Sequence, residues 1–192
     1  MSQIEVIKNP NGIEGLAVIK PTVHRDSRGY FVETYNQKEM EEAGLFLTFV
    51  QDNQSKSYKG VLRGLHFQKN YPQGKLVRVI QGAVYDVAVD LRKNSPTYGS
   101  YYGIILTDTN FLQFFIPKGF AHGFLVLSDE AVFAYKCTDY YHPNDEGGLA
   151  WDDPDIGIKW PLDGIEKVKL SEKDKANPIL KKIETSGFKF MF

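Results

Sequence analysis

The feature of this 192-residue sequence that most constrains its fold is a succession of short β-like runs between Leu47 and Tyr141. These runs are rich in β-branched and aromatic residues, and Gly, Pro, Asn or Asp separates most of them. They read LTFVQDNQS, GVLRGLHFQ, KLVRVIQG, AVYDVAVDLR, SYYGIILT, FLQFFIPKG, GFLVLS and AVFAYKCTDYY. About eight strands with almost no helix between them predict an all-β sandwich or barrel of jelly-roll type, and they argue against a βαβ fold.

The chain shows no internal repeat, low-complexity tract or linker, so we predict a single domain over residues 1–192. Residues 1–20 contain two apolar runs around an Asn-Pro-Asn-Gly turn and predict two short strands. A further strand is expected from Tyr30 to Tyr35. Residues 179–192, which end in GFKFMF, are expected to form a peripheral tail.

Two short helices are indicated by capping residues. Asn36 precedes a run of helix formers and Gly44 follows it, which predicts an N-cap and a C-terminal stop. In SEKDKANP, Ser171 is the expected N-cap and Pro178 lies beyond the helix. The predicted architecture is thus an all-β body with a few short helices at its periphery.

Composition excludes several classes of protein. A formal net charge of −1 gives no overall attraction to nucleic acid or to an anionic membrane. The single cysteine, Cys137, excludes an intrachain disulfide framework and a Cys-rich zinc site. No apolar run reaches the length of a membrane span, and the N-terminal residues do not form a secretory signal. We therefore expect a cytoplasmic protein.

The stretch GVLRGLHFQKNYPQGKLVRVI, residues 60–80, places Arg63, His66, Gln68 and Lys75 among apolar strand residues. Such side chains are costly to bury unless they have partners or a ligand. We interpret them as lining a pocket that binds an anionic sugar derivative and moves its protons. Strict strand alternation puts Arg63 and His66 on opposite faces, and a β-bulge at Gly64 would realign them.

His66 is a candidate general base. A lone strand histidine is more often hydrogen-bonded within a core, but two nearby cations favour the neutral imidazole that a base needs. Lys75, otherwise a solvated strand-end lysine, is a candidate for stabilising an oxyanion. Tyr135, otherwise a core aromatic, would suit proton delivery from the face opposite to the base.

His122 follows a Pro-Gly turn in IPKGFAHGF and raises the question of a metal. Of the cupin metal-binding pattern only the distal PxGxxH part is present, and no second histidine or glutamate accompanies His66. Two histidines alone are a poor site for zinc or iron. We therefore predict no functional metal.

Other polar and aromatic residues suit the recognition of a diphosphate and a base, although each alone is more typical of a surface or turn position. Arginine offers paired charge-assisted hydrogen bonds to phosphate, and an exposed aromatic ring can stack on a base. This set consists of Arg28, Phe31, Glu33, Gln51, Asn53 and Arg63. Neither a Rossmann nor a P-loop motif is present.

The order of several long motifs resembles the dTDP-4-dehydrorhamnose 3,5-epimerases. The matching segments are DSRGYFVET, FVQDNQS, GVLRGLHFQ, QGKLVRVIQG, DVAVDLRKNSPTYG, IPKGFAHGFLVLSD, YKCTDYYHP, WDDPDIGIKWP and LSEKDK. The resemblance implies a cupin-type jelly roll without metal or organic cofactor. It also implies a homodimer that exchanges the N-terminal strands in residues 1–20. HFQKNYPQGK departs from the Pro-Pro-Ala-Gln form of many members.

The resemblance also implies a role for each matching residue. His66 would be the base, Asp174 its dyad partner, Lys75 the enolate stabiliser and Tyr135 the opposing acid. Thymidine diphosphate and sugar would be bound by Arg28, Phe31, Glu33, Gln51, Asn53, Arg63, Glu146 and Lys173, with His122 and Tyr141 lining the pocket. The expected reaction converts dTDP-4-dehydro-6-deoxy-D-glucose to dTDP-4-dehydro-L-rhamnose by inversion at C3 and C5.

Three alternatives remain open at the level of sequence. A mono-epimerase or ketoisomerase on the same scaffold would act on one carbon, because the difference lies in how the sugar ring is seated. A metal-dependent cupin, such as a dioxygenase or phosphosugar isomerase, is disfavoured by the incomplete ligand set. A non-catalytic sugar-nucleotide-binding jelly roll would leave the base, acid and lysine without a role.

Overall fold

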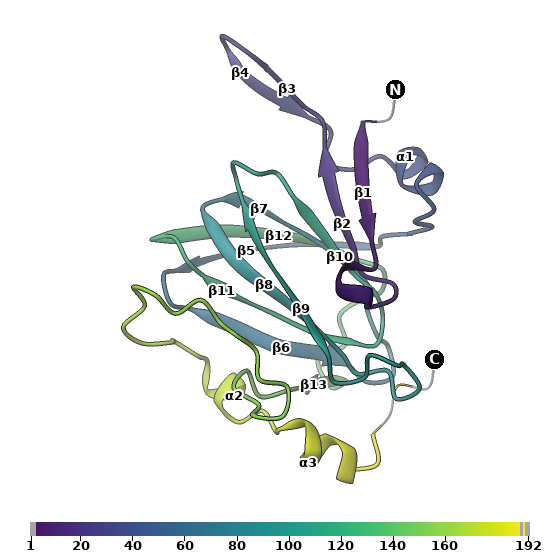
Figure 1. Cartoon of the computed structure of the whole chain (residues 1–192), viewed down its shortest axis with the longest axis vertical. Coiled ribbons are helices and arrows are strands. Elements are labelled where there is room, and N and C mark those ends of the chain that lie inside the picture. Colours follow the sequence, from purple (N-terminus) through teal and green to yellow (C-terminus); the bar gives the residue numbers. More distant parts are fainter. Residues whose placement is uncertain (1–2, 189, 191–192) are drawn as a thin grey trace.

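Two antiparallel sheets that face each other form the body of the structure, a computed structural model that describes residues 3–188 and 190 (Figure 1). The first sheet has six strands in the order β1-β2-β10-β7-β12-β5. These strands are β1 (Ile4–Lys8), β2 (Ala17–Pro21), β10 (Gln113–Ile116), β7 (Lys75–Gln81), β12 (Glu130–Cys137) and β5 (Gln51–Tyr58).

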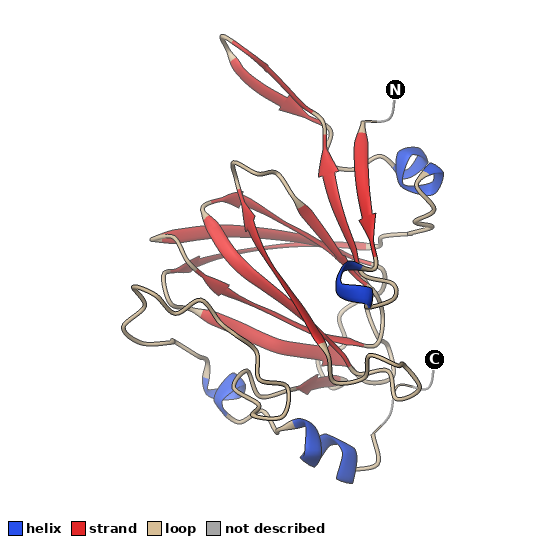
Figure 2. Cartoon of the chain, viewed as in Figure 1, coloured by secondary structure: helices blue, strands red, loops and turns tan. Residues whose placement is uncertain are grey.

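The second sheet has five strands in the order β13-β6-β11-β8-β9. These strands are β13 (Glu146–Gly148), β6 (Leu62–Gln68), β11 (Phe120–Val126), β8 (Ala83–Asp90) and β9 (Tyr101–Thr107). Helices lie at the periphery of the strands (Figure 2). The predicted all-β jelly roll with a few short helices is confirmed.

The main hydrophobic core lies between the sheets. Val77 and Phe133 come from the six-stranded sheet, and Val84 and Phe124 from the five-stranded sheet. Strand β8 is buried on both faces because its alternate residues enter different clusters: Val84 joins the inner core, whereas Val87 joins a second cluster. A β-sheet covered on both sides gives the continuous apolar run seen in this part of the sequence.

The second cluster lies against the five-stranded sheet and is completed by the C-terminal segment. Leu180 and Ile183 of α3 (Leu180–Thr185) and Phe190 join Leu65 and Phe67 of β6 there. Leu180, Ile183 and Phe190 are all buried. After Pro178 the chain thus forms a helix whose apolar side chains pack on the outer face of the sheet, and the peripheral tail over residues 179–192 stays a prediction.

A two-stranded hairpin projects beyond the two sheets at the top of Figure 1. Its strands are β3 (Val23–Asp26) and β4 (Gly29–Val32). Near its tip Tyr30 meets Phe111 edge-to-face at 4.8 Å, and the Arg25 guanidinium lies 5.2 Å from the Phe111 ring. These contacts fix the hairpin on the β9–β10 loop.

Both predicted helices are present with their predicted caps. The Asn36 side chain accepts a hydrogen bond from the Glu39 amide at the start of α1 (Gln37–Glu42), and Gly44 follows the helix with a φ of 76°. Ser171 caps α2 (Glu172–Lys175). The 3-10 helix η1 (Pro10–Gly12) occupies the predicted turn between β1 and β2.

Several strand ends differ from the prediction, because the pairing partner decides where a strand ends. Strand β5 begins at Gln51 rather than near Leu47, opposite Cys137, which is the last residue of β12. Strand β4 ends at Val32 rather than Tyr35, opposite the first residue of β3. Strand β11 begins at Phe120, earlier than the apolar run suggests, because it pairs there with β8.

Candidate active site

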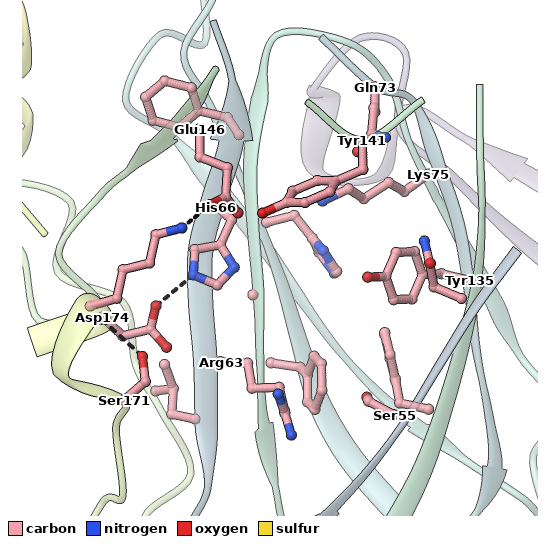
Figure 3. A pocket seen from close by; sticks show the side chains of 18 of the residues that line it. Ser55, Arg63, His66, Gln73, Lys75, Tyr135, Tyr141, Glu146, Ser171 and Asp174 are labelled. Atoms are coloured by element: carbon pink, nitrogen blue, oxygen red, sulfur yellow. Dashed lines mark hydrogen bonds and ion pairs between the residues drawn. The ribbon is translucent and has the colours of Figure 1, made fainter. Parts of the chain in front are cut away.

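A cavity of about 690 Å³ lies between the two sheets and contains most of the predicted site residues (Figure 3). The five-stranded sheet, the six-stranded sheet and α2 all contribute side chains. Eleven of the fourteen predicted residues line it: Gln51, Asn53, Arg63, His66, Lys75, His122, Tyr135, Tyr141, Glu146, Lys173 and Asp174. The exposed lining residues Tyr141 and Lys173 mark its mouth.

The predicted β-bulge in β6 brings Arg63 and His66 to one face. On the neighbouring strand β11, His122 pairs with His66 and Phe124 with Arg63, so three residues of β6 span the distance of two on β11. Gly64 occupies the bulge with a φ of 120°, and an added Cβ there would lie 2.6 Å from Gly123 Cα. The position therefore requires glycine.

His66 and Asp174 form a short contact across 108 residues of sequence. His66 Nε2 lies 2.5 Å from Asp174 Oδ1, and the Asp174 side chain is 5% exposed. The Asp174 amide donates to Ser171 Oγ at 3.0 Å, so the N-cap of α2 fixes the carboxylate. Burial opposes ionisation of Asp174, but hydrogen bonds from His66 and Ser171 outweigh it and lower its pKa.

Lys75 and Tyr135 enter the cavity from the opposite sheet (Figure 3). Lys75 pairs with Cys137 across β7 and β12, which places Lys75, Tyr135 and Cys137 on the same face. Lys75 Nζ lies 5.8 Å from the Tyr135 ring centre. Burial lowers the pKa of Lys75 and raises the pKa of Tyr135 above its ordinary value.

His122 is held by a carboxylate that sequence reasoning did not assign. His122 Nε2 lies 3.0 Å from both oxygens of Asp86, and both side chains are almost fully buried. Burial lowers the pKa of His122 and raises the pKa of Asp86, so both shifts favour the neutral pair. The sequence did contain a signal for this partner. Asp86 lies within the apolar run AVYDVAV, and a buried aspartate needs a hydrogen-bonding partner.

The structure does not assemble a metal-binding cluster in its described residues: no group of three or more His, Cys, Asp or Glu side chains is arranged to hold an ion. His66 and His122 are neighbours across β6 and β11, but each is hydrogen-bonded to its own aspartate. Each imidazole thus already has a carboxylate partner.

The cavity mouth is organised by polar contacts among its lining residues. Gln51 Nε2 donates to Asn53 Oδ1 at 3.1 Å, and Gln51 Oε1 accepts from the Tyr141 amide at 3.0 Å. Lys173 forms an ion pair with Glu146, which joins α2 to β13. Arg63 is exposed and keeps its terminal nitrogens available while its Nε donates to Ser57 at 2.9 Å.

Arg28, Phe31 and Glu33 do not line this cavity. Arg28 lies at the tip of the β3–β4 hairpin and pairs with Asp26 at 2.6 Å, and Phe31 is 68% exposed. Glu33 lies beyond the end of β4, so it does not share a strand face with Phe31, and it accepts a hydrogen bond from Asn36.

Sequence reasoning also missed Ser55, Gln73 and Ser171 as lining residues, whereas Gln68 was expected in the pocket and does line it. Buried Gln68 donates to the carbonyls of Tyr71 and Tyr140 and accepts from the His142 amide, so it ties two loops to β6. The alternation of polar residues along β5 indicated Ser55; nothing in the local sequence indicated the others.

The arrangement is suited to proton transfer next to a carbonyl group. An imidazole backed by a carboxylate faces a phenol across the cavity, and an ammonium group lies beside the phenol (Figure 3). A base and an acid on opposite walls can remove a proton from one face of a carbon and return one to the other.

Comparison with known proteins identifies the family of this chain. The model of the family described as dTDP-4-dehydrorhamnose 3,5-epimerase matches residues 10–182. The chain belongs to this family. An epimerase of this name from Methanothermobacter thermautotrophicus is 57% identical over 175 residues, covering 91% of this chain and 94% of the relative. Homologues of the chain are thus isomerases that act on carbohydrates.

Solved structures share the cupin-type fold. The dTDP-6-deoxy-D-glucose-3,5-epimerase of Legionella pneumophila, in complex with dTDP-4-keto-L-rhamnose, is 49% identical, with a TM-score of 0.92 and 98% of each chain covered. ChmJ, a 3′-monoepimerase from Streptomyces bikiniensis in complex with dTDP-quinovose, is 34% identical, with a TM-score of 0.84 and 91% of this chain and 88% of ChmJ covered.

Proposed function

We propose that this epimerase inverts C3 and C5 of dTDP-4-dehydro-6-deoxy-D-glucose to give dTDP-4-dehydro-L-rhamnose. The observation that carries the proposal is the His66–Asp174 pair opposite Tyr135 and Lys75 in one cavity. Family membership supplies the substrate class, since the Legionella relative binds dTDP-4-keto-L-rhamnose.

In the proposed mechanism neutral His66 removes the proton from the carbon next to the C4 ketone, and Asp174 stabilises the resulting imidazolium. The electron pair of the C–H bond moves to the ketone oxygen, and the Lys75 ammonium stabilises the enolate. Tyr135 then protonates the carbon from the opposite face, which inverts it. The same groups serve C3 and C5 because both flank one ketone.

The nucleotide is proposed to bind at the mouth of the cavity. Arg63, Gln51, Asn53, Glu146 and Lys173 all line the cavity, and Arg63 and Lys173 are exposed. Charge-assisted hydrogen bonds from arginine and lysine suit a diphosphate. His122 and Tyr141 are proposed to shape the wall around the sugar.

The test is proton exchange in deuterated water. Wild-type enzyme incubated with the 4-keto-6-deoxyhexose nucleotide should place deuterium at both C3 and C5, read carbon by carbon by NMR. His66→Ala should lose at least about 10²-fold in exchange, the usual scale of general-base catalysis, while still binding dTDP. If the folded wild-type protein exchanges the proton of neither C3 nor C5, the proposed epimerase activity is refuted.

The second candidate function is inversion of one carbon only. It is favoured by the shared fold of ChmJ, a 3′-monoepimerase. Deuterium at C3 alone, with C5 unchanged after long incubation, would select it. If activity is lost on chelation and restored by a metal, the protein is instead a metal-dependent cupin.

We further propose a homodimer in which the β3–β4 hairpin of one copy covers the cavity of the other. The hairpin projects from its own subunit and carries the predicted ligands Arg28 and Phe31, which its own cavity does not include (Figure 1). Exposed Phe31 would become buried in such a contact. Within this chain β1 and β2 pair with each other and β2 pairs with β10; the predicted exchange of the strands in residues 1–20 between copies stays a prediction.

In the described residues no helix combines the length and apolar character needed to cross a bilayer. The expected cytoplasmic location stays a prediction.

A further inference from the structure

The C-terminal segment contacts both sides of strand β6 at the catalytic histidine. On one side Asp174 of α2 binds His66. Further along the segment, Phe188 and Phe190 pack on Phe67, the next residue of β6. Successive strand residues point to opposite faces, so the segment brackets β6 at two adjacent positions.

Phe67 is held tightly between two elements. Its ring stacks on Phe188 with ring centres 5.3 Å apart and meets Phe190 edge-on at 5.6 Å, while Phe188 and Phe190 lie 4.8 Å apart. On strand β13, a Cβ added to Gly147 would lie 2.3 Å from the Phe67 ring. The ring therefore has contacts on the side of Gly147 and on the side of the phenylalanines, which limits movement of β6.

The segment that carries these phenylalanines is also anchored by contacts that do not involve Phe67. The Leu180 amide donates to buried Asp153 at 2.6 Å, and Lys93 pairs with Glu184 at 3.1 Å. The Phe190 carbonyl accepts from the Lys93 amide at 3.3 Å. These bonds anchor the start of α3, its Glu184 side chain and Phe190.

Phe190 also lines a small cavity of about 10 Å³. Its other walls include His66, Lys75 and His122, which line the main cavity as well. Phe190 is 2% exposed. Phe190 therefore shares the walls of this small cavity with the proposed catalytic residues His66 and Lys75.

We propose that Phe188 and Phe190 form a positioning element for catalysis: they hold β6 so that His66 stays on Asp174, and Phe190 keeps water away from Lys75. The inference rests on the proposed function. The two residues lie beyond the segment matched by the family model, which ends at residue 182.

The electrostatic environment of Lys75 supports the second part of this proposal. Burial is the largest influence on Lys75 and lowers its pKa. The titratable groups around it are Tyr135 and Cys137 on β12, Asp86 on β8, His122 on β11 and His66 on β6. Water admitted beside Lys75 would weaken the effect of burial and return the pKa of Lys75 toward its ordinary value.

The test compares Phe190→Ala with Ile183→Ala, a matched control in the same buried cluster that does not line the small cavity. Phe190→Ala should lower kcat for C–H exchange about 10- to 100-fold, the scale of a displaced catalytic group, and move the alkaline limb of the rate to higher pH. Its Kd for dTDP should stay within about twofold, because Phe190 does not line the main cavity. Ile183→Ala should lower Tm and leave kcat and the pH limb unchanged.

Hydrogen exchange of backbone amides gives a readout that does not need catalysis. The peptide containing residues 62–68 should exchange faster in Phe188→Ala/Phe190→Ala than in Ile183→Ala, and Phe190→Leu should restore part of the protection and of kcat. Equal kcat, pH limb and peptide protection in Phe190→Ala and Ile183→Ala would overturn the proposal. A wild-type protein that exchanges no substrate proton would instead refute the proposed function, and the amide measurement would still decide whether the segment holds β6.

Discussion

At the scale of single residues, the space between the two sheets contains titratable side chains, which are rare in an apolar core. Lys75, Asp86 and His122 lie together between the sheets, and their mutual contacts reduce the cost of their burial. The described side chains leave no buried polar atom without a hydrogen-bond partner. This cluster maintains a polar wall beside the proposed reacting carbon.

The pH dependence of the reaction should be set on its alkaline side by Lys75. A lysine with a lowered pKa loses its positive charge at a lower pH than the ordinary value of about 10.4, so enolate stabilisation fails first there. Tyr135, whose pKa is raised, stays protonated over this range. The alkaline limb of kcat for exchange should lie below about pH 10.4 and should move to higher pH in Lys75→Arg, because guanidinium keeps its proton.

The control for this prediction is Tyr135→Phe, whose residual exchange should keep the same alkaline limb. If the limb disappears in Tyr135→Phe and stays in Lys75→Arg, the phenol is the titrating group and the assignment is wrong.

Asp86 should contribute to stability through His122. Asp86→Ala leaves a buried imidazole without its partner, which should lower the free energy of unfolding by about 1–3 kcal/mol. Asp86→Asn, which keeps a hydrogen-bonding group, should cost less. Urea unfolding measures both, with exposed Asp52→Asn as the control, where loss of the ion pair with Lys136 should cost about 0–1 kcal/mol. Equal effects at positions 86 and 52 would contradict the assignment.

At the scale of elements, two short features bring the dyad together. The bulge in β6 turns Arg63 and His66 to one face, and the cap of α2 points Asp174 at the imidazole. Each feature depends on one residue, Gly64 for the bulge and Ser171 for the cap. Catalytic geometry here thus depends on local backbone structure at each end of the hydrogen bond.

Removal of the α2 cap should affect the reaction more than substrate binding. Ser171→Ala takes away the acceptor for the Asp174 amide, which typically costs about 1 kcal/mol of stability. The exchange rate should fall about tenfold because Asp174 is displaced. Ser171→Thr keeps the acceptor and should retain most of the wild-type rate. Kinetics in deuterated water measure the rates, and an unchanged rate in Ser171→Ala would show that Asp174 is held by other contacts.

At the scale of the whole molecule, the sheets form the cavity and the hairpin extends away from it (Figure 1). The predicted ligands Arg28 and Phe31 are therefore separated, within one chain, from the eleven predicted site residues that line the cavity. A second copy with two-fold symmetry would restore them, because each subunit of such a dimer gives its hairpin and receives another.

Mixed dimers test this exchange. Arg28→Ala/Phe31→Ala and His66→Ala proteins should each be nearly inactive alone. After unfolding and refolding together, they should recover roughly a quarter of wild-type activity, because half of the dimers are mixed and each has one complete site. Sedimentation should show dimers in every sample. A mixture no more active than its two parts would mean that the hairpin does not serve the partner's cavity.

The fold class was predictable because the alternation of apolar and polar residues, broken by turn residues, repeats along most of the chain. Local features were predictable because the residues that signal them lie within a few positions of each other. These features are the caps Asn36 and Ser171 and the bulge at Gly64. The ends of strands were less predictable, because β4, β5 and β11 begin or end where a partner strand does.

The sequence by itself determined the local preferences of this protein: the strands, the caps, the bulge and the types of side chain that could carry proton transfer. Only the tertiary structure decided that Asp174 meets His66, that Asp86 holds His122 and that Phe190 packs behind the catalytic strand. These contacts join residues far apart in the chain. Their energy comes from burial and hydrogen bonds that exist only after the sheets and the C-terminal segment have packed together.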